Sequence, residues 1–523
     1  MRHVLLVAAW VVVATQTQAA DPCASQYFQI RVVDEDTGRG VPLVELETTN
    51  NIRLVTDSAG VVAFLEPGLM DKTVWFTVRS HGYEHAKDGF GSQGKALKVT
   101  PGGKAELKVK RINIAERLYR VTGGGIYRDS VLLGLPTPIT EPVLNGQVLG
   151  CDSVMSLIYK GKIFWIWGDT NQPKYPLGNF DATGAISELP GKGGLDPSVG
   201  VNFKYFVKPD GFVKGIAPIP GKGPTWPFAP VVLKVDGRER MFAGYGKIRG
   251  SSMETYERGL CVWNDETEQF EKVAEWRLDH PVVPTGHAFR GRVNGVEYIY
   301  FAAAMPLTRV RAKPELLKNL DNFETFTCLK EGSTMKNPQL DRDSRGRLRY
   351  SWKRNTPAVY QKEQDELIAK GLMKKEEALI QLHDVETGQP VLAHAGTVHW
   401  NAYRRKWIMI VCQQFGTSVL GETWYAEAPT PTGPWGPARK IVTHNEYSFY
   451  NPRHHPFFDQ EGGRIIYFEG TYTHSFSGNK YQTPRYDYNQ VMYRLDLADP
   501  RLKLPPASPN GILHEQVEPV PEL

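Results

Sequence analysis

Two aspartates, Asp152 and Asp169, flank the strand-forming run SLIYKGKIFWIW, and their spacing predicts a pair of carboxylates. If Lys160 and Gly161 form a two-residue hairpin turn, facing residues have numbers that sum to 321, so Asp152 faces Asp169. Directly opposed residues of antiparallel strands have β-carbons about 4.5–5.5 Å apart, so one of the two carboxylates should be hard to ionise. Such a pair can protonate a leaving group with one member while the other acts as a base or nucleophile.

The same counting places further polar and aromatic residues opposite one another. A turn at residues 236 and 237 puts Trp226 opposite Lys247, and a turn near residue 461 brings Glu469 close to His454 or His455. A bulge of one residue in any of these hairpins would rotate its residue out of register. We expect the open ends of the hairpins to meet at one mouth of a common channel, where acid, base and aromatic groups converge.

The candidate site residues divide into two groups by predicted role. The candidate catalytic residues are Asp152, Asp169, Glu254, Glu422 and Glu469, and the candidate substrate-binding residues are Trp226, Lys247, Arg249, His287, His394, Arg453, His454, His455 and Tyr472. We expect Asp152 or Asp169 to be the base or nucleophile and Glu254 or Glu422 to be the acid. The competing interpretations are a turn aspartate at 169, a solvated loop acid at 254 and a strand-end hydrogen bond at 422.

The elements that must position these residues are all strands. From residue 26 to about 110, short alternating strands separated by Asp-Thr-Gly, Asn-Asn and Pro-Gly-Gly turns predict a small β-sandwich of about seven strands. From residue 151 onward, one unit recurs: an apolar strand, a tight turn and a second apolar strand rich in aromatics. Most units are followed by a more polar pair of strands, which predicts an all-β chain with a five- or six-bladed β-propeller.

The predicted domain boundaries follow these changes in pattern. Only residues 358–382 break the repeat, and they indicate a helix. The chain divides into a signal peptide at 1–20, a β-sandwich at 26–112, a connecting segment at 113–150, a propeller at 151–505 and a C-terminal tail at 506–523.

Composition and charge exclude several function classes. Of the 523 residues, 62 are basic and 57 acidic, well mixed along the chain, so a nucleic-acid partner is not expected. Arg2 and His3 precede an apolar run from Val4 to Ala14, and Thr17-Gln18-Ala19 supplies the small residues that a signal peptidase needs, which predicts export to a periplasm or the outside of the cell. No later run is long and apolar enough to cross a bilayer. The five cysteines are too few and scattered for a disulfide framework, so we expect at most one or two bridges and no metal site built on sulfur. We expect a monomer.

Two stretches carry resemblances to known families. GRGVPLVELETTN, TDSAGVVAF and VRSHGYE resemble the carboxypeptidase regulatory-like, or transthyretin-like, domain, which implies an accessory module. The runs CDSVMSLIYKGKIFWIWGDTN, HAGTVHWNAYRRKWIMIV, ETWYAEAPTPTGPWGP and NPRHHPFFDQEGGRIIYFEGTY resemble the propeller glycoside hydrolases of arabinanase and xylosidase type. The second resemblance covers about two thirds of the chain and implies a polysaccharide or oligosaccharide substrate.

The match to the hydrolase motifs is incomplete. Asp152 stands where that family has a catalytic aspartate at the start of the first blade. The acid that follows an alanine-proline pair in the next blade is replaced by Val231, and the glutamate that opens a later inner strand is replaced by Gly286 and His287. The resemblance therefore leaves the proton donor open among Glu254, Glu422, Glu469 and His287.

Other chemistries remain open at this stage. The propeller could bind glycans or proteins without catalysis, or act as a polysaccharide lyase in which Tyr472, His287 and Arg453 supply a base and a cation. Lys247, Arg249 and Arg453 could recognise an acidic sugar or simply pair with carboxylates. The histidines at 394, 399, 454 and 455 lack zinc-ligand spacing. No cofactor is required for carboxylate chemistry, and the related propellers suggest a structural Ca²⁺ near Asp152 and Asp169.

Overall fold

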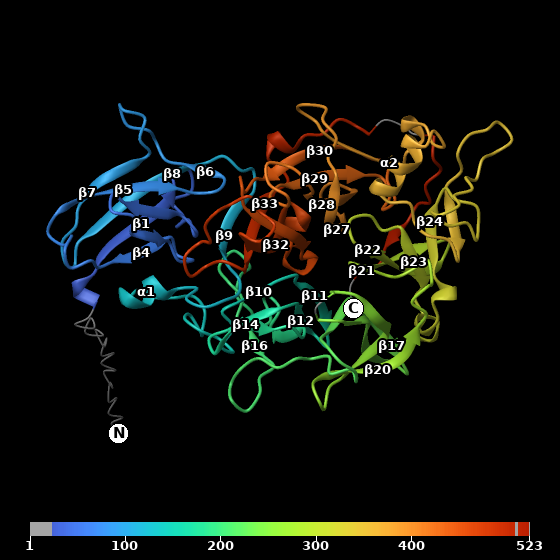
Figure 1. The fold of residues 1–523 in the computed structure, drawn as a ribbon, viewed down its shortest axis with the longest axis horizontal. Helices are drawn as coiled ribbons and strands as arrows, with labels where there is room; N and C mark the ends of the chain where they lie inside the picture. Colours follow the sequence, from blue (N-terminus) through green and yellow to red (C-terminus); the bar gives the residue numbers. More distant parts are fainter. Residues whose placement is uncertain (1–23, 251, 508–510, 522–523) are drawn as a thin grey trace, which may run out of the picture.

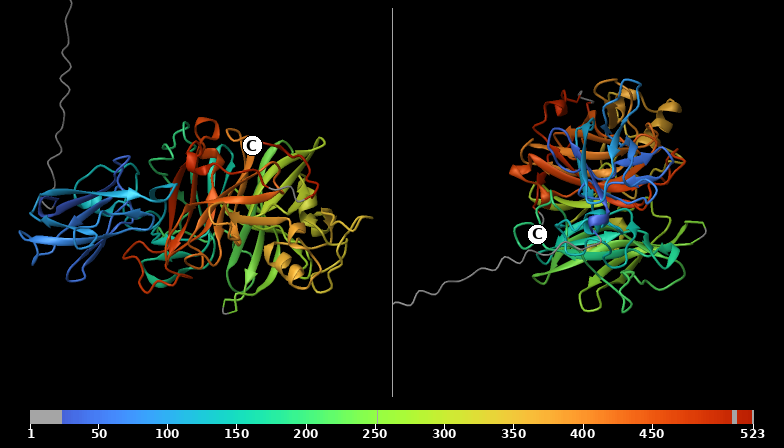
Figure 2. Two further views of the ribbon diagram at one scale, coloured as in Figure 1. Left: turned by 90° about the horizontal axis from the view of Figure 1, so that it is seen from above. Right: turned by 90° about the vertical axis from the view of Figure 1, so that its left-hand side faces the viewer.

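The fold is mostly β, with strands gathered into two regions along the longest axis of the molecule (Figures 1 and 2). The structure is a computed structural model and describes residues 24–250, 252–507 and 511–521. Within those residues the α-helices are α1 (Arg128–Leu132) and α2 (Gln361–Ala369). The predicted signal peptide and Cys23 lie outside the described residues.

The N-terminal region consists of two four-stranded sheets that share one hydrophobic core. One sheet has the order β4-β1-β8-β6 and the other the order β3-β2-β5-β7. Alternating burial along β5 shows why these sequences form sheets: every second side chain points into the core, where Ile30 and Leu107 of one sheet meet Leu46 and Phe76 of the other. The strands are β1 (Phe28–Asp34), β2 (Glu45–Thr48), β3 (Arg53–Val55), β4 (Val61–Phe64), β5 (Thr73–Arg79), β6 (Tyr83–Glu84), β7 (Gly94–Lys98) and β8 (Lys104–Arg111).

The larger region contains five sheets that follow one another around a common centre, from β12 through β17, β22 and β28 to β32 (Figure 1). The first sheet is β11 (Met155–Tyr159), β12 (Lys162–Trp167), β15 (Thr183–Ser187) and β16 (Lys204–Tyr205). The second is β17 (Thr225–Val235), β18 (Arg238–Ile248), β19 (Thr255–Asn264) and β20 (Gln269–Trp276). The third is β21 (His287–Val293), β22 (Val296–Ala302), β23 (Thr308–Arg311), β24 (Glu324–Thr327) and β25 (Ser351–Arg354), joined by β34 (Glu518–Pro519).

The last two sheets use strands from distant parts of the sequence. The fourth is β26 (Ile380–Asp384), β27 (Ala393–Asn401), β28 (Lys406–Gln413), β29 (Thr423–Ala428) and β30 (Trp435–Val442), with β26 parallel to β30. The fifth is β31 (Ser448–His454), β32 (Ile465–Thr473) and β33 (Asn489–Asp496), completed by β9 (Glu116–Arg120). A small sheet of β10 (Gly150–Cys151), β13 (Thr170–Gln172) and β14 (Tyr175–Asn179) extends the first hairpin.

Hydrophobic clusters fill the spaces between neighbouring sheets. Phe164 of the first sheet packs in one cluster with Met241 of the second, and Trp165 of the first sheet packs in another with Met492 of the fifth. The second and third, third and fourth, and fourth and fifth sheets also share clusters. Because each sheet is sandwiched between two others, the side chains at the inner strand ends are held in fixed positions around the centre.

Several expectations from the sequence need correction. The run PQLDRDSRGRLRYSWK at residues 338–353 fits the recurring hairpin pattern in the sequence but is not a unit of its own, since only β25 is a regular strand there and it pairs at the edge of the third sheet. The helix expected at 358–382 is limited to α2, and β26 follows it. The connecting segment at 113–150 contributes β9 to the last sheet. Four cysteines (Cys151, Cys261, Cys328 and Cys412) are buried and free.

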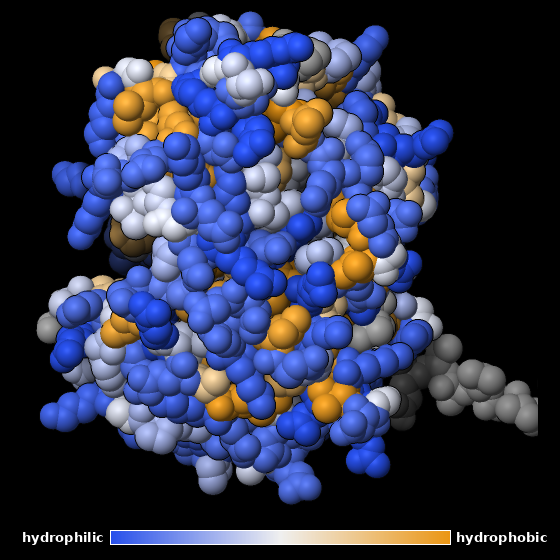
Figure 3. Space-filling view, turned by 90° about the vertical axis from the view of Figure 1, so that its right-hand side faces the viewer, coloured by the Kyte–Doolittle hydropathy of each residue, from blue (hydrophilic) through white to orange (hydrophobic). Residues whose placement is uncertain are grey.

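The surface at the end away from the N-terminal region is mainly hydrophilic, with small separate hydrophobic spots (Figure 3). No helix of the described chain has the length and apolar character needed to span a membrane. This end of the larger region therefore shows no broad apolar face.

Candidate active site

A pocket of about 650 Å³ lies where the inner strands of the five sheets meet. Each sheet contributes to its lining: Asp152 lies just before β11, Trp226 is on β17, His287 on β21, Thr397 on β27 and Arg453 on β31. A volume of this size is typical of small-molecule and substrate sites. Four residues predicted to converge, Asp152, Trp226, His287 and Arg453, therefore line one pocket, and Thr397 joins them.

Asp152 and Asp169 face each other across the first hairpin, as predicted. Lys160 and Gly161 both have positive φ (51° and 75°), the geometry of a two-residue hairpin turn, and Met155 pairs with Ile166. Beyond the strands, the Asp152 amide donates to the Asp169 carbonyl at 3.3 Å. Both side chains line the pocket, so two carboxylates stand at its edge.

Burial and mutual repulsion keep one proton on this pair near neutral pH. Burial, then the neighbouring charges of Asp152 and Asp181, raises the pKa of Asp169 to about 7. Burial also raises the pKa of Asp152, but hydrogen bonds from Tyr450 and Tyr488 to its carboxylate oppose this; the Tyr450 hydroxyl donates to Oδ2 at 2.8 Å. Oδ1 of Asp169 is buried without a hydrogen-bond partner. The two environments thus differ: burial and two neighbouring acids favour the protonated form of Asp169, whereas hydrogen bonds from two tyrosines favour the charged form of Asp152.

Five residues of the pocket wall have left-handed backbone conformations. They are Ser153 (φ 54°), Met253 (φ 57°), Asn451 (φ 51°), Phe476 (φ 59°) and Tyr488 (φ 61°). Such conformations cost of order 1–3 kcal/mol for residues other than glycine and cluster at functional sites. The strain is supported by local contacts, since the Asn451 amide donates to the Ser153 hydroxyl at 2.8 Å.

Aromatic side chains form much of the wall. Trp226 lies over the pocket with its indole N–H donating to the Phe180 carbonyl at 2.9 Å. Phe476 is 65 % exposed and packs edge-on against Tyr450, with centroids 6.0 Å apart. Flat exposed rings next to carboxylates can stack on the apolar faces of sugar rings while the acids engage the hydroxyls.

Arg453 and His287 line the pocket, and both side chains are buried. Arg453 donates to the Ser156 carbonyl at 2.7 Å and pairs in register with Glu469. Both ring nitrogens of His287 lie close to backbone groups, Nδ1 at 3.0 Å from the Ala302 carbonyl. Burial, then the Arg453 charge, lowers the pKa of His287 to about 3. His287 is therefore a neutral wall residue and a poor base.

Glu469 occupies a sealed position beneath the pocket. Its Oε1 lies 2.9 Å from Nε2 of His455, whose Nδ1 lies 2.9 Å from the Ser156 hydroxyl. The predicted contact between Glu469 and His455 is confirmed. All three side chains are almost completely buried, and burial raises the pKa of Glu469 to about 8. They form a polar chain inside the core and do not line the pocket.

The register predicted for the second hairpin is wrong by one residue. Near the turn the pairing is as expected, but a bulge between Phe228 and Val231 shifts the outer half, so Lys247 faces Thr225. Ala229 marks the bulge with a φ of 48°. The Lys247 ammonium donates to the carbonyls of Ile219 and Gly223 and to Thr225, and it does not line the pocket.

The remaining candidates lie outside the pocket lining. Glu254 and Arg249 form an exposed ion pair at 3.4 Å, and Glu422 is buried, accepting hydrogen bonds from Thr417 and Thr443. His394 is exposed at the start of β27, His454 lies 2.8 Å from Asp459, and Tyr472 is buried near the N-terminal region. The two expected proton donors, Glu254 and Glu422, are therefore not placed beside Asp152.

Sequence analysis missed Tyr450, Tyr488, Asn451 and Phe476. Phe476 and Tyr488 lie in the loop between β32 and β33, and Tyr450 and Asn451 lie in β31 beside a shift in register, so hairpin counting says nothing about their side-chain direction. The one available signal was composition: the stretch EYSFYN precedes Arg453 and the stretch RYDYN precedes β33, each with aromatics close to an amide.

The structural Ca²⁺ suggested near Asp152 and Asp169 stays a prediction. Ca²⁺ takes about six to eight oxygen ligands, and Asp152 and Asp169 are the two carboxylates that line the pocket. In the part of the chain that the structure describes, no group of three or more His, Cys, Asp or Glu side chains is arranged to hold a metal ion. The chemistry below is therefore derived from the side chains alone.

Comparison with known proteins finds similarity at the level of solved structures. No family model and no curated protein matches the chain. It is similar to the GH43_1 enzyme from Xanthomonas citri complexed with xylotriose, with 11% identity, 72% of this chain and 95% of that chain covered, and a TM-score of 0.33.

Two further solved structures are similar to the same extent. An α-L-arabinofuranosidase from Clostridium thermocellum has 13% identity, covers 71% of this chain and 94% of its own, and has a TM-score of 0.31. An exo-β-1,3-galactanase from Phanerochaete chrysosporium with β-1,3-galactotriose has 10% identity, covers 72% and 65%, and has a TM-score of 0.34. All three are glycoside hydrolases; with TM-scores below 0.5, the likeness does not define the function of this chain.

Proposed function

We propose that this chain is a glycoside hydrolase that cleaves a polysaccharide or oligosaccharide in the pocket between the five sheets. The observation that carries the proposal is the pair of facing carboxylates, Asp152 and Asp169, in an aromatic-lined pocket with strained walls. Cleavage of a glycosidic bond needs one carboxylic acid and one carboxylate at the same place. The raised pKa of Asp169, about 7, supplies the acid at neutral pH.

In this mechanism Asp169 is the proton donor. Its protonated carboxyl group transfers a proton to the glycosidic oxygen as the bond to the anomeric carbon breaks. Asp169 takes the role expected for Glu254 or Glu422. Glu254 is exposed and paired with Arg249, and Glu422 is buried and accepts a hydrogen bond from the Thr417 amide.

Asp152 is the carboxylate partner. Hydrogen bonds from Tyr450 and Tyr488 favour its charged form and orient it. It acts on the anomeric carbon either directly or through a water molecule, and the anomer released first distinguishes these routes. Trp226 and Phe476 supply ring faces for the sugar, and Arg453 fixes the base of the pocket.

The wider architecture is interpreted in the same way. We infer that the five sheets form a five-bladed β-propeller and that the two N-terminal sheets form a carboxypeptidase regulatory-like β-sandwich. The apolar run after Arg2 and His3 supports export through a signal peptide. The protein would then act as a secreted or periplasmic monomer without a cofactor.

Elimination is a weaker alternative. A lyase needs a tyrosine or histidine that can take a proton, but burial raises the pKa of Tyr450 and Tyr488 and lowers that of His287. Tyr472, the base considered from the sequence, lies at a different cavity.

The experiment measures release of reducing ends from neutral, acidic and sulfated polysaccharides by the wild type and by an Asp152→Asn, Asp169→Asn double variant. Hydrolysis by the wild type alone supports the proposal. Products that absorb in the ultraviolet indicate elimination, and glycan binding without new reducing ends from any substrate indicates a binding propeller; either result overturns it.

A further inference from the structure

A cavity of about 1050 Å³ lies between the N-terminal region and the fifth sheet. One wall is the sheet β3-β2-β5-β7, through residues such as Glu45, Glu47 and Arg79. The other wall is formed by Tyr447 and the loop from residue 474 to 488, which joins β32 to β33. Nothing in the chemistry of the candidate active site uses this cleft.

The charges of the sheet wall neutralise one another. Arg79 pairs with Glu47 and, at 3.3 Å, with Glu45, and Arg53 lies 3.8 Å from Glu45. These four residues carry two positive and two negative charges, and their ion pairs run across neighbouring strands. Glu84 of β6 also lines the cavity, so the lining offers hydrogen-bond donors and acceptors with no excess of positive charge, which favours an uncharged polar ligand over an acidic one.

The loop wall offers an exposed aromatic ring and amide groups. Tyr481 is 56 % exposed, and the Arg53 guanidinium lies over its ring at 4.9 Å, so the tyrosine and the N-terminal sheet are already in contact. Asn479 and Gln482 lie beside it, and Asn445 stands on the adjoining segment. An exposed ring flanked by amides, hydroxyls and paired charges is the kind of surface that binds a polyhydroxylated sugar chain.

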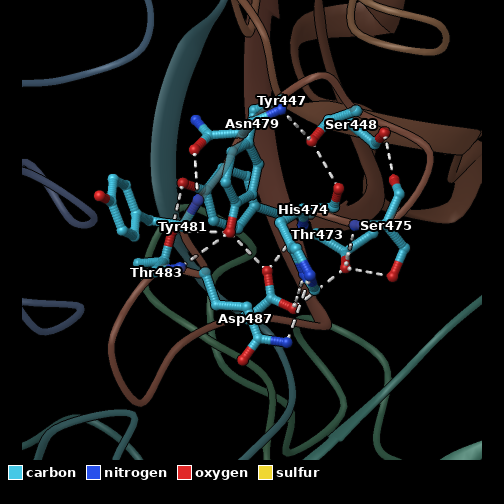
Figure 4. A network of polar contacts seen from close by, with 12 residues as sticks. Tyr447, Ser448, Thr473, His474, Ser475, Asn479, Tyr481, Thr483 and Asp487 are labelled. Atoms are coloured by element: carbon cyan, nitrogen blue, oxygen red, sulfur yellow. Dashed lines mark hydrogen bonds and ion pairs between the residues drawn. The ribbon is translucent and has the colours of Figure 1, made fainter.

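The loop is held by a polar network (Figure 4), and its Tyr486 side chain packs into a hydrophobic cluster. Asp487 accepts hydrogen bonds from the Tyr447 hydroxyl, from the Thr473 hydroxyl at 3.1 Å and from the His474 amide at 2.7 Å. Thr483 donates to the Tyr447 hydroxyl through its amide at 3.0 Å. Both ends of the loop are therefore anchored, and the part that carries Tyr481 faces the cleft.

The same loop also walls the candidate active site. Ser475, Phe476 and Tyr488 line the pocket with Asp152, whereas Asn479, Tyr481 and Thr483 line the cleft. A ligand in the cleft would thus contact the loop that positions Tyr488 near the Asp152 carboxylate.

We propose that the cleft between the N-terminal region and the fifth sheet is a second carbohydrate-binding site, which takes a neutral oligosaccharide on Tyr481. The site goes beyond the proposed hydrolase function and does not require it, because the ligand class follows from the chemistry of the cleft walls. Binding there retains the chain on a polysaccharide independently of the acids Asp152 and Asp169.

The test is isothermal titration calorimetry of the full chain with neutral hexasaccharides of xylan, arabinan, galactan and cellulose and with a hexamer of galacturonate as the acidic probe. The Asp152→Asn, Asp169→Asn background prevents turnover, and Trp226→Ala in that background weakens the pocket. We expect a neutral hexasaccharide to bind this triple variant, and Tyr481→Ala to weaken that binding by at least tenfold. Tyr403→Ala is the matched control, because Tyr403 is also exposed but lies in the turn between β27 and β28 and does not line the cleft.

Three results would overturn the proposal: no hexasaccharide binds the triple variant, Tyr481→Ala binds as well as the control, or only uronate oligomers bind. The outcome is separable from that of the hydrolase proposal. Tyr481-dependent binding by a chain that releases no reducing ends would sustain the second site and refute hydrolysis, whereas hydrolysis without Tyr481-dependent binding would do the reverse.

Discussion

Asp169 and Glu469 are both acids whose pKa is raised by burial, to about 7 and about 8, yet they stand in different surroundings. Asp169 faces Asp152 at the edge of a pocket. Glu469 faces His455 in the core, where neither side chain is exposed. A perturbed pKa therefore does not by itself identify a catalytic acid; access of a substrate to the acid decides between a reactive group and a structural one.

The largest expected effect is on catalysis. Asp152→Asn and Asp169→Asn should each lower kcat/KM on a polysaccharide by about 10²–10⁴, the usual contribution of a general acid or base. Glu469→Gln, assayed at a temperature where it stays folded, should lower kcat/KM by less than about tenfold, because Glu469 does not reach the pocket. Equal losses for Asp169 and Glu469 variants would break the distinction between the two acids.

The next effect is on the pH dependence of stability. The folded-state pKa of Glu469, about 8, lies above its ordinary value of 4.5, so between these pH values the folded protein holds a proton that the unfolded chain releases. Stability should therefore fall as pH rises through this window, by up to about 1.4 kcal/mol per pH unit. Glu469→Gln should reduce that slope in denaturant titrations at pH 5 to 8, leaving the part that comes from Asp169, whose pKa is also raised, and Glu461→Gln, at an exposed acid, should leave the slope unchanged.

A smaller effect concerns the hydrogen bond from Tyr450 to Asp152. Tyr450→Phe removes a donor that favours the ionised carboxylate, so the pKa of Asp152 should rise. The acidic limb of the kcat/KM profile should then move to higher pH by about one pH unit. Tyr472→Phe, at the cleft between the N-terminal region and the fifth sheet, should leave that limb in place. An unmoved limb in both variants would mean that Asp152 is not the ionised partner.

The smallest effect concerns the exposed ring of the pocket wall. Phe476→Ala should raise KM about five- to tenfold with little change in kcat, because a stacking surface for the sugar is lost while the acids stay in place. Phe90, which is 99 % exposed on the N-terminal region, provides the control variant Phe90→Ala. A fall in kcat without a change in KM would show that Phe476 acts on the reacting groups instead.

The part of the site that could be predicted from the sequence is the part built on regular hairpins. Asp152 and Asp169 were placed correctly because the turn at Lys160 and Gly161 has two residues and no bulge separates it from the pair. Counting failed at Lys247, where the bulge at Ala229 moved one strand by a residue. A bulge depends on contacts made across the sheet, so the local sequence alone does not predict it.

The fold was predictable to a similar degree. Alternating strands and repeated hairpins identified an all-β chain, and four of the hairpin units correspond to paired strands at the start of the first four sheets. The fifth sheet was harder to predict, because its first strand, β31, lies earlier in the sequence than the strand expected there. Its edge strand, β9, comes from a segment more than 300 residues before β31. The role proposed for Asp169 as proton donor was not assigned from the sequence for the same reason: the pKa of Asp169 depends on burial by distant segments.

The most direct test of the account compares leaving groups in the two aspartate variants. The measurement is kcat/KM on the natural oligosaccharide and on the 2,4-dinitrophenyl glycoside of the same sugar, whose leaving group needs no proton. If Asp169 is the acid and Asp152 the carboxylate partner, Asp169→Asn should lose about 10²–10⁴ on the oligosaccharide but stay within about tenfold of wild type on the aryl glycoside. Asp152→Asn should lose activity on both. Equal losses by Asp169→Asn on both substrates would contradict the assignment.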